Sequence, residues 1–187
     1  MNNIEKTKEF VKQRFIENPD FSFDDWKVMY NHSLKVEEIA LKIAESVECD
    51  KLLLSIGALL HDIGKTYKVD VETLHYKHEE FNLRVAERFI DSLGFPSERL
   101  EKLKQIISFK GNSIELKIIK DADALALYAD KTLYMLYIKW AHGNGLDSSI
   151  KRKLDKFSKL NFKVSKEIGK NWFEQTKKGW EEYMDLE

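Results

Sequence analysis

A few histidines and aspartates lie on predicted helix faces that are otherwise apolar. His32 precedes an apolar stripe that runs from Val36 to Val47, and His61 follows an apolar run that begins at Leu52. Burying such a side chain without a partner costs about 1–3 kcal/mol, so we expect each of them to have one. Converging carboxylates would also repel one another unless a proton or a cation lay among them. The residues in this group are His32, His61, Asp62, His78, Asp121 and Asp123.

This pattern has two interpretations. A single buried histidine is most often a core residue with its own hydrogen-bond partners, and a single buried aspartate is most often a helix cap or an ion-pair partner. Several imidazoles and carboxylates directed into one core favour a borderline divalent metal such as Mn, Fe, Co, Ni or Zn. Periodicity does not choose between Asp121 and Asp123, because each shares a helix face with apolar residues.

The elements that carry these residues are predicted to be helices. The chain has 187 residues with only two prolines and eight glycines, and no segment alternates as a half-buried strand does. The expected fold class is all-α, as a single domain of residues 1–187. Helices are expected over 4–17, 25–47, 51–64, 78–93, 96–108, 114–141, 147–159 and 164–184, with a loop over 66–76.

Composition excludes several classes of protein. The 31 basic and 32 acidic residues give a net charge of −1, so bulk binding of nucleic acid or of an anionic membrane is not expected, although a local basic patch is compatible with this balance. The single cysteine, Cys49, excludes an intramolecular disulfide framework and suits the cytoplasm. The longest apolar stretch, residues 52–60, is too short to span a bilayer.

The order and spacing of the polar residues resemble the signature of the HD-domain superfamily of metal-dependent phosphohydrolases. His32 is followed after 28 residues by the pair His61-Asp62, and after 60 more by Asp123. The sequence Ala-Leu-Leu-His-Asp-Ile-Gly-Lys at 58–65 resembles the central motif of this family, and 31–36 and 119–125 resemble the motifs of its first histidine and last aspartate. The resemblance covers a core of about 25–130, and the helices at about 147–184 are similar to the C-terminal helices of small members.

The resemblance implies an HD-domain helical bundle in which His32, His61, Asp62 and Asp123 bind a divalent metal (Mn, Fe, Co, Ni, Mg or Zn). It favours Asp123 because the ligand of the family usually stands in a motif such as Ala-Asp-Ala-Leu at 122–125. Asp121 is kept as a neighbour of the site. His78 resembles a histidine that binds a second metal in some relatives, but residues 106–110 lack the other histidine, which favours one metal or a weak second one.

The implied activity is hydrolysis of a nucleotide-like phosphomonoester or phosphodiester by a metal-activated water. Asp62 would orient or deprotonate the water, and Lys65 would neutralise charge developing on the phosphoryl group. Solvated positions at helix ends are the alternatives for Lys65 and for Glu79, which is a candidate pocket residue. The alternative function is a non-catalytic regulatory module that binds metal and nucleotide, and a purely structural helical domain would need the four ligands to be far apart.

Overall fold

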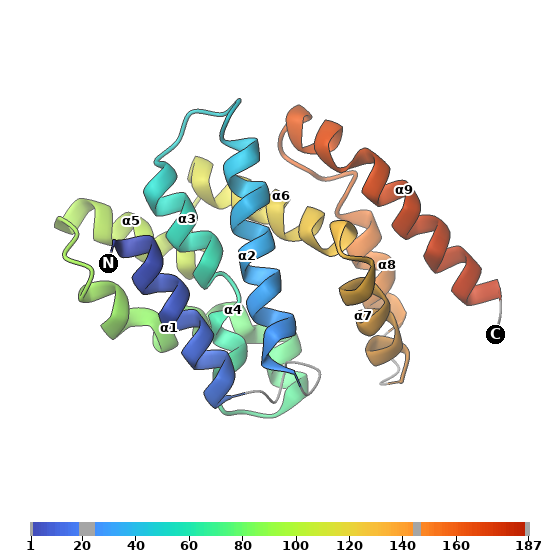
Figure 1. The fold of residues 1–187 in the computed structure, drawn as a ribbon, viewed down its shortest axis with the longest axis horizontal. Helices are drawn as coiled ribbons and strands as arrows, with labels where there is room; N and C mark the ends of the chain where they lie inside the picture. Colours follow the sequence, from blue (N-terminus) through green and yellow to red (C-terminus); the bar gives the residue numbers. More distant parts are fainter. Residues whose placement is uncertain (1, 19–24, 144–146, 186–187) are drawn as a thin grey trace. The chain divides into compact units, whose positions relative to one another are not determined.

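The computed structural model describes residues 2–18, 25–143 and 147–185, and within these ranges the regular structure is entirely helical. The all-α prediction is therefore confirmed (Figure 1). No helix in these ranges is long and apolar enough to cross a membrane. The elements are α1 (Asn3–Glu17), α2 (Trp26–Ile43), α3 (Lys51–Leu60), the 3-10 helix η2 (Ile63–Thr66), α4 (Val71–Asp91), α5 (Ser97–Ile107), α6 (Ile114–Ala129), α7 (Lys131–Gly143), α8 (Asp147–Asp155) and α9 (Lys163–Asp185).

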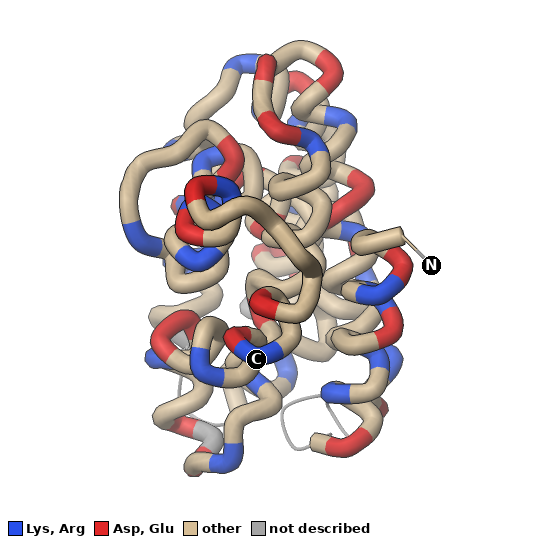
Figure 2. Tube along the Cα trace, turned by 90° about the vertical axis from the view of Figure 1, so that its left-hand side faces the viewer, with Lys and Arg blue, Asp and Glu red and all other residues tan. Residues whose placement is uncertain are grey.

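The chain forms two compact units, residues 1–119 and 120–187, and α6 runs from the first into the second. The single domain of residues 1–187 remains a prediction. Along most of the chain trace the positions of basic and acidic residues are interspersed, in keeping with the nearly neutral composition (Figure 2).

Helix α3 is the centre of the first unit. Its residues 53–60 are all buried, and it packs against α1, α2 and α5, as expected for a helix that is apolar on every face. Its first turn is held by Asp50, whose carboxylate accepts hydrogen bonds from the backbone N–H groups of Leu52 and Leu53. The guanidinium of Arg99 in α5 also binds this carboxylate. The core helix is thus anchored at its N-terminus and leads directly to His61.

Several predicted boundaries differ from those of the structure, and three of the differences have a clear local reason. The predicted helix 51–64 ends at Leu60, because the N–H of Gly64 donates to the side chain of Asn82 (2.7 Å) instead of continuing the helix. The predicted loop 66–76 is shorter, since Asp70 accepts from the N–H of Thr73 (2.8 Å) and starts α4 at Val71. The predicted helix 114–141 is two helices, α6 and α7.

The break between α6 and α7 comes from a helix cap. The carboxylate of Asp130 accepts a hydrogen bond from the N–H of Leu133 at 2.9 Å, and this contact begins α7. Within the second unit, α7 contacts α8 and α9. Gly169 lets α9 pack closely on α6, because a side chain at this position would meet the Cδ2 atom of Leu125 at 2.1 Å.

Candidate metal site

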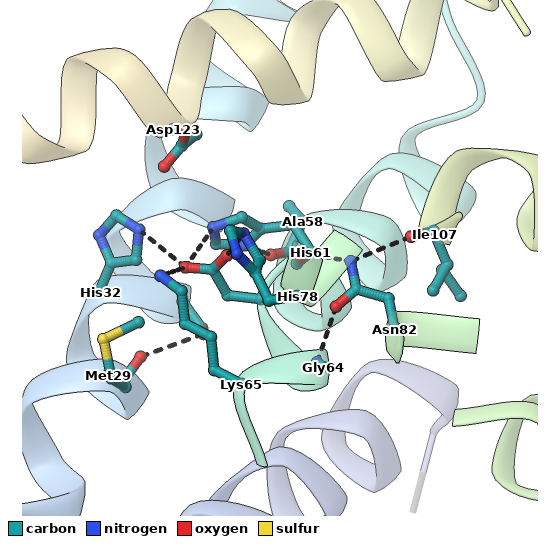
Figure 3. A network of polar contacts seen from close by, with 12 residues as sticks. Met29, His32, Ala58, His61, Gly64, Lys65, His78, Asn82, Ile107 and Asp123 are labelled. Carbon is teal, nitrogen blue, oxygen red and sulfur yellow. Dashed lines mark hydrogen bonds and ion pairs between the residues drawn. The ribbon is translucent and has the colours of Figure 1, made fainter. Parts of the chain in front are cut away.

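The carboxylate of Asp62 is the centre of a buried polar cluster in the first unit. Figure 3 shows His32, His61, Lys65 and His78 of this cluster from close by. The Oδ2 atom of Asp62 lies 3.7 Å from Nε2 of His32 and 3.3 Å from Nε2 of His61. Its Oδ1 atom lies 3.1 Å from Nε2 of His78. The ammonium group of Lys65 lies 2.5 Å from Oδ2. Four side chains that are spread over 47 positions of the sequence therefore converge on one carboxylate.

Each side chain of this cluster comes from a different position in the fold. His32 lies in α2, His61 directly follows the last residue of α3, and Lys65 and His78 belong to η2 and α4. His32, His61 and Asp62 are 7%, 2% and 4% exposed. Lys65 is also mostly buried, with a side chain that is 15% exposed, so it is not a solvated lysine at a helix end.

Backbone carbonyls fix the tautomers of two of the imidazoles. Nδ1 of His61 lies 2.8 Å from the carbonyl of Ala58, and Nδ1 of His78 lies 3.0 Å from the carbonyl of Leu74. Because a carbonyl oxygen only accepts, both Nδ1 atoms carry a proton. Nε2 then carries the lone pair in a neutral ring, and in an imidazolium it carries a second N–H that can donate to Asp62. Nε2 is the atom that faces Asp62 in both residues. An Nδ1 that is anchored on the backbone, with Nε2 directed into a polar cluster, is typical of histidines that bind metals.

Asp62 stays ionised in this environment. Burial on its own would raise the pKa of its carboxyl group, but the charge of Lys65 and the interactions with His61 and His78 outweigh burial and hold the pKa well below its usual range. The cluster thus presents an ionised carboxylate together with imidazole nitrogens, which is the ligand chemistry that borderline divalent metals prefer.

Asn82 holds the backbone around His61 and Gly64, and sequence reasoning missed it. Its side-chain amide donates to the carbonyls of His61 (2.5 Å) and Ile107 (3.1 Å), while its Oδ1 accepts from the N–H of Gly64 (Figure 3). The side chain is fully buried. Its position four residues after His78, on the buried face of α4, was the available signal, because a buried amide needs partners.

Gly64 is required by close approach of α4. A Cβ atom at this position would lie 2.0 Å from the carbonyl oxygen of His78 and 2.8 Å from the backbone nitrogen of Asn82. The glycine of the central motif therefore allows the turn after His61 to touch the backbone of the helix that carries His78.

The two aspartates of α6 have different surroundings within the second unit. Asp121 is 1% exposed, and its oxygens accept from the backbone N–H groups of Asn161 (2.9 Å) and Phe162 (3.1 Å) and from the side chain of Asn161 (2.7 Å). Asp123 is half-buried and pairs with the ammonium group of Lys156 at 3.2 Å. Asp121 thus fixes the segment before α9, whereas Asp123 forms an ion pair with Lys156 at a half-buried position.

The remaining candidates lie outside the Asp62 cluster. Glu79 is exposed on α4, as expected for a solvated position. His75 lies in α4 instead of a loop, with its ring 4.7 Å from that of Tyr76.

Comparisons with known proteins identify a family for most of the first unit. The HD domain family model matches residues 29–128. A tRNA (cytidine(56)-2'-O)-methyltransferase from Picrophilus torridus is 30% identical over 161 residues, which are 80% of this chain and 45% of that protein. A symmetrical bis(5'-nucleosyl)-tetraphosphatase from Staphylococcus aureus is 34% identical over 73 residues, which are 36% of this chain and 32% of that protein. The chain therefore spans less than half the length of these relatives.

A solved structure shares the fold. The crystal structure of an HD-superfamily hydrolase from Bacillus thuringiensis superposes with a TM-score of 0.72, covering 98% of this chain and 95% of the other at 18% identity.

Proposed function

Because the chain belongs to the HD domain family, and is thus an HD-superfamily hydrolase, we propose that it is a metal-dependent phosphohydrolase acting on a nucleotide-like phosphomonoester or phosphodiester. The observation that carries this proposal is the convergence of the imidazoles of His32, His61 and His78 on the ionised carboxylate of Asp62. Burying a carboxylate and several imidazole nitrogens together costs free energy unless cations or protons compensate the negative charge and the lone pairs.

The proposed ligands are His32, His61, Asp62 and Asp123. The engagement of Asp121 with the segment before α9 supports Asp123, and not Asp121, as the aspartate of the ligand set.

The side chains of the cluster have distinct roles in the proposed reaction. A bound divalent ion would lower the pKa of a water molecule and polarise a phosphoryl oxygen. Asp62 orients that water and accepts its proton. Lys65, already beside Asp62, is placed to bind a phosphate oxygen and neutralise charge on the phosphoryl group. His78, whose Nε2 lies 3.1 Å from Asp62, would hold a second ion only weakly together with Asp62.

Nucleoside polyphosphates are among the candidate substrates. The name of the Staphylococcus aureus relative describes a phosphatase of bis(5'-nucleosyl) tetraphosphates, which supports including nucleoside polyphosphates among the candidates. The similarity to the methyltransferase covers less than half of that protein, and no methyl transfer is proposed.

A regulatory module that binds metal and nucleotide without turnover is the second candidate. It is favoured by the sequence of residues 106–110, which lacks the histidine that would complete a site for two metals. The two functions share the metal ligands and differ only in turnover.

The test is elemental analysis of the purified protein, coupled to a panel of nucleotides and phosphoesters with Mn²⁺, Co²⁺, Ni²⁺ or Mg²⁺. We expect about one metal ion per chain, and we expect His61→Ala to lose it together with at least about 100-fold in kcat/KM, more than is typical for a residue that only supports a ligand. His75→Ala, a histidine outside the cluster, is the matched control and should keep both. Unchanged metal content and activity in His61→Ala would contradict the proposal. Metal and nucleotide binding without turnover across the panel would favour the regulatory module.

A further inference from the structure

Basic residues are concentrated in one segment of the second unit. Although the chain has a net charge of −1, residues 148–170 contain eight basic and two acidic side chains, a net charge of +6. Apart from the half-buried Lys153, the basic side chains are exposed. They are Lys151, Arg152, Lys153, Lys156, Lys159, Lys163, Lys166 and Lys170, and the acidic ones are Asp155 and Glu167.

A hollow with a volume of about 670 Å³ lies in the same unit, between α8, the segment that follows it and α9. This volume is within the usual range for ligand pockets, which is roughly 300–1,000 Å³. Three of its lining residues are aromatic, namely Phe157, Phe173 and Trp180, and the first two stack with ring centroids 4.1 Å apart. Two lysines, Lys151 and Lys177, also line it.

We propose that this hollow and the lysines beside it bind single-stranded nucleic acid. Proteins bind single strands by stacking bases on aromatic side chains while a positively charged surface follows the phosphates. The hollow supplies the aromatic groups, and Lys151 and Lys177 supply cations at the same place. The inference uses none of the proposed metal ligands and is independent of the proposed hydrolase activity.

The extent of the basic segment favours a polymer over a free mononucleotide. Two lysines in the hollow suffice for one nucleotide, whereas Lys159, Lys163 and Lys166 are exposed and do not line the hollow. They would bind phosphates further along a strand. An anionic membrane is the less fitting partner, because binding to a membrane requires an apolar face that inserts, and here the aromatic side chains line a concave surface.

Two acidic side chains limit the expected affinity. Asp155 and Glu181 also line the hollow, and Glu181 lies 3.7 Å from the ammonium group of Lys177. A phosphate must therefore compete with a carboxylate for Lys177. We expect binding at the micromolar level that weakens steeply as salt rises, since each phosphate contact releases counterions.

The experiment measures fluorescence anisotropy of a labelled ten-nucleotide oligouridylate with the full chain, in the presence of a chelator, at about 50 and 200 mM salt. We expect Lys177→Glu to weaken binding about tenfold, because it removes a cation that lines the hollow and adds a like charge. Lys178→Glu is the matched control. Lys178 is the next residue, is also exposed and pairs in the same way with Glu182 at 3.6 Å, but it does not line the hollow. Trp180→Ala, checked for folding by circular dichroism, should cost a similar factor.

Four outcomes would overturn the proposal. One is the absence of oligonucleotide binding at low salt. A second is an equal effect of Lys177→Glu and Lys178→Glu, which would mean general electrostatic attraction without the hollow. A third is equal affinity for uridine monophosphate, which would identify a site for a free nucleotide. The fourth is binding to vesicles that contain phosphatidylserine but not to the oligonucleotide.

Discussion

The Asp62 cluster of the first unit and the lysine-lined hollow of the second use polar side chains in opposite ways. In the first, Asp62 and Asn82 are buried, and their partners are fixed groups of neighbouring elements, so the arrangement is set before any ligand arrives. In the second, the lysines around the hollow are exposed and pair with carboxylates only at the surface. Buried polar groups hold a precise geometry, so a substitution that removes one partner lowers stability strongly. Exposed charges tolerate substitution and contribute long-range electrostatic attraction. Substitutions should therefore have large effects in the first case and small ones in the second.

The largest difference is expected between two glycines, one from each unit. Gly64→Ala should lower the free energy of unfolding by about 3 kcal/mol, because the new Cβ would lie 2.0 Å from a backbone oxygen of α4 that cannot rotate away. Gly179→Ala in α9 meets nothing within 4 Å and should instead stabilise the helix by about 0.5–1 kcal/mol. Urea unfolding measures both. Equal changes in unfolding free energy for the two variants would show that α4 can move away from the turn after His61.

Asn82→Ala tests whether the buried turn depends on side-chain hydrogen bonds. The change leaves the carbonyls of His61 and Ile107 and the N–H of Gly64 without this partner, so we expect a loss of about 2–3 kcal/mol of unfolding free energy. Asn31→Ala, at an exposed position of α2, is the control and should change stability by less than about 0.5 kcal/mol. A loss below about 1 kcal/mol for Asn82→Ala would mean that water replaces the amide.

The two aspartates of α6 sharpen the comparison within a single helix. Asp121→Asn should cost about 2 kcal/mol of stability and leave metal content unchanged, because it weakens charge-assisted bonds to the segment before α9. Asp123→Asn should cost less than about 1 kcal/mol, as expected for a partly exposed ion pair with Lys156, but it should lower metal content. Urea unfolding and elemental analysis of the two variants separate these effects. The reverse assignment would make Asp121 the ligand.

The features that the sequence predicted well are those that follow from burying side chains in the core. Apolar stripes identified the helices, and His32, His61 and His78 stood out because polar groups on such stripes need partners. In the structure the Nε2 atoms of these histidines lie 3.1–3.7 Å from the carboxylate of Asp62. Helix ends were harder, because a cap such as Asp130 is an ordinary polar residue until its N–H partner is known. The hollow of the second unit could not be foreseen, since exposed lysines and half-buried aromatic residues are common on any helix surface.

The smallest expected effect concerns Asp50, which caps the N-terminus of α3. Its side chain is half-buried, more exposed than Asp62 and less exposed than the lysines of the hollow. Burial on its own raises the pKa of its carboxyl group, but the N–H of Leu53 and the guanidinium of Arg99 outweigh burial and lower it. A lowered pKa in the folded state means that the stabilisation is fully present above the unfolded value of about 3.9 and is lost as the pH falls through the folded value. Asp50→Asn should therefore cost about 1 kcal/mol at pH 7, and this difference from the wild type should shrink below pH 4.

Arg99→Gln should show the same dependence on pH. The double variant should lose less stability than the sum of the two single variants, because both remove one interaction that water partly screens. A difference that stays constant from pH 7 to pH 3 would show that Asp50 acts as a neutral cap, with no contribution from its charge.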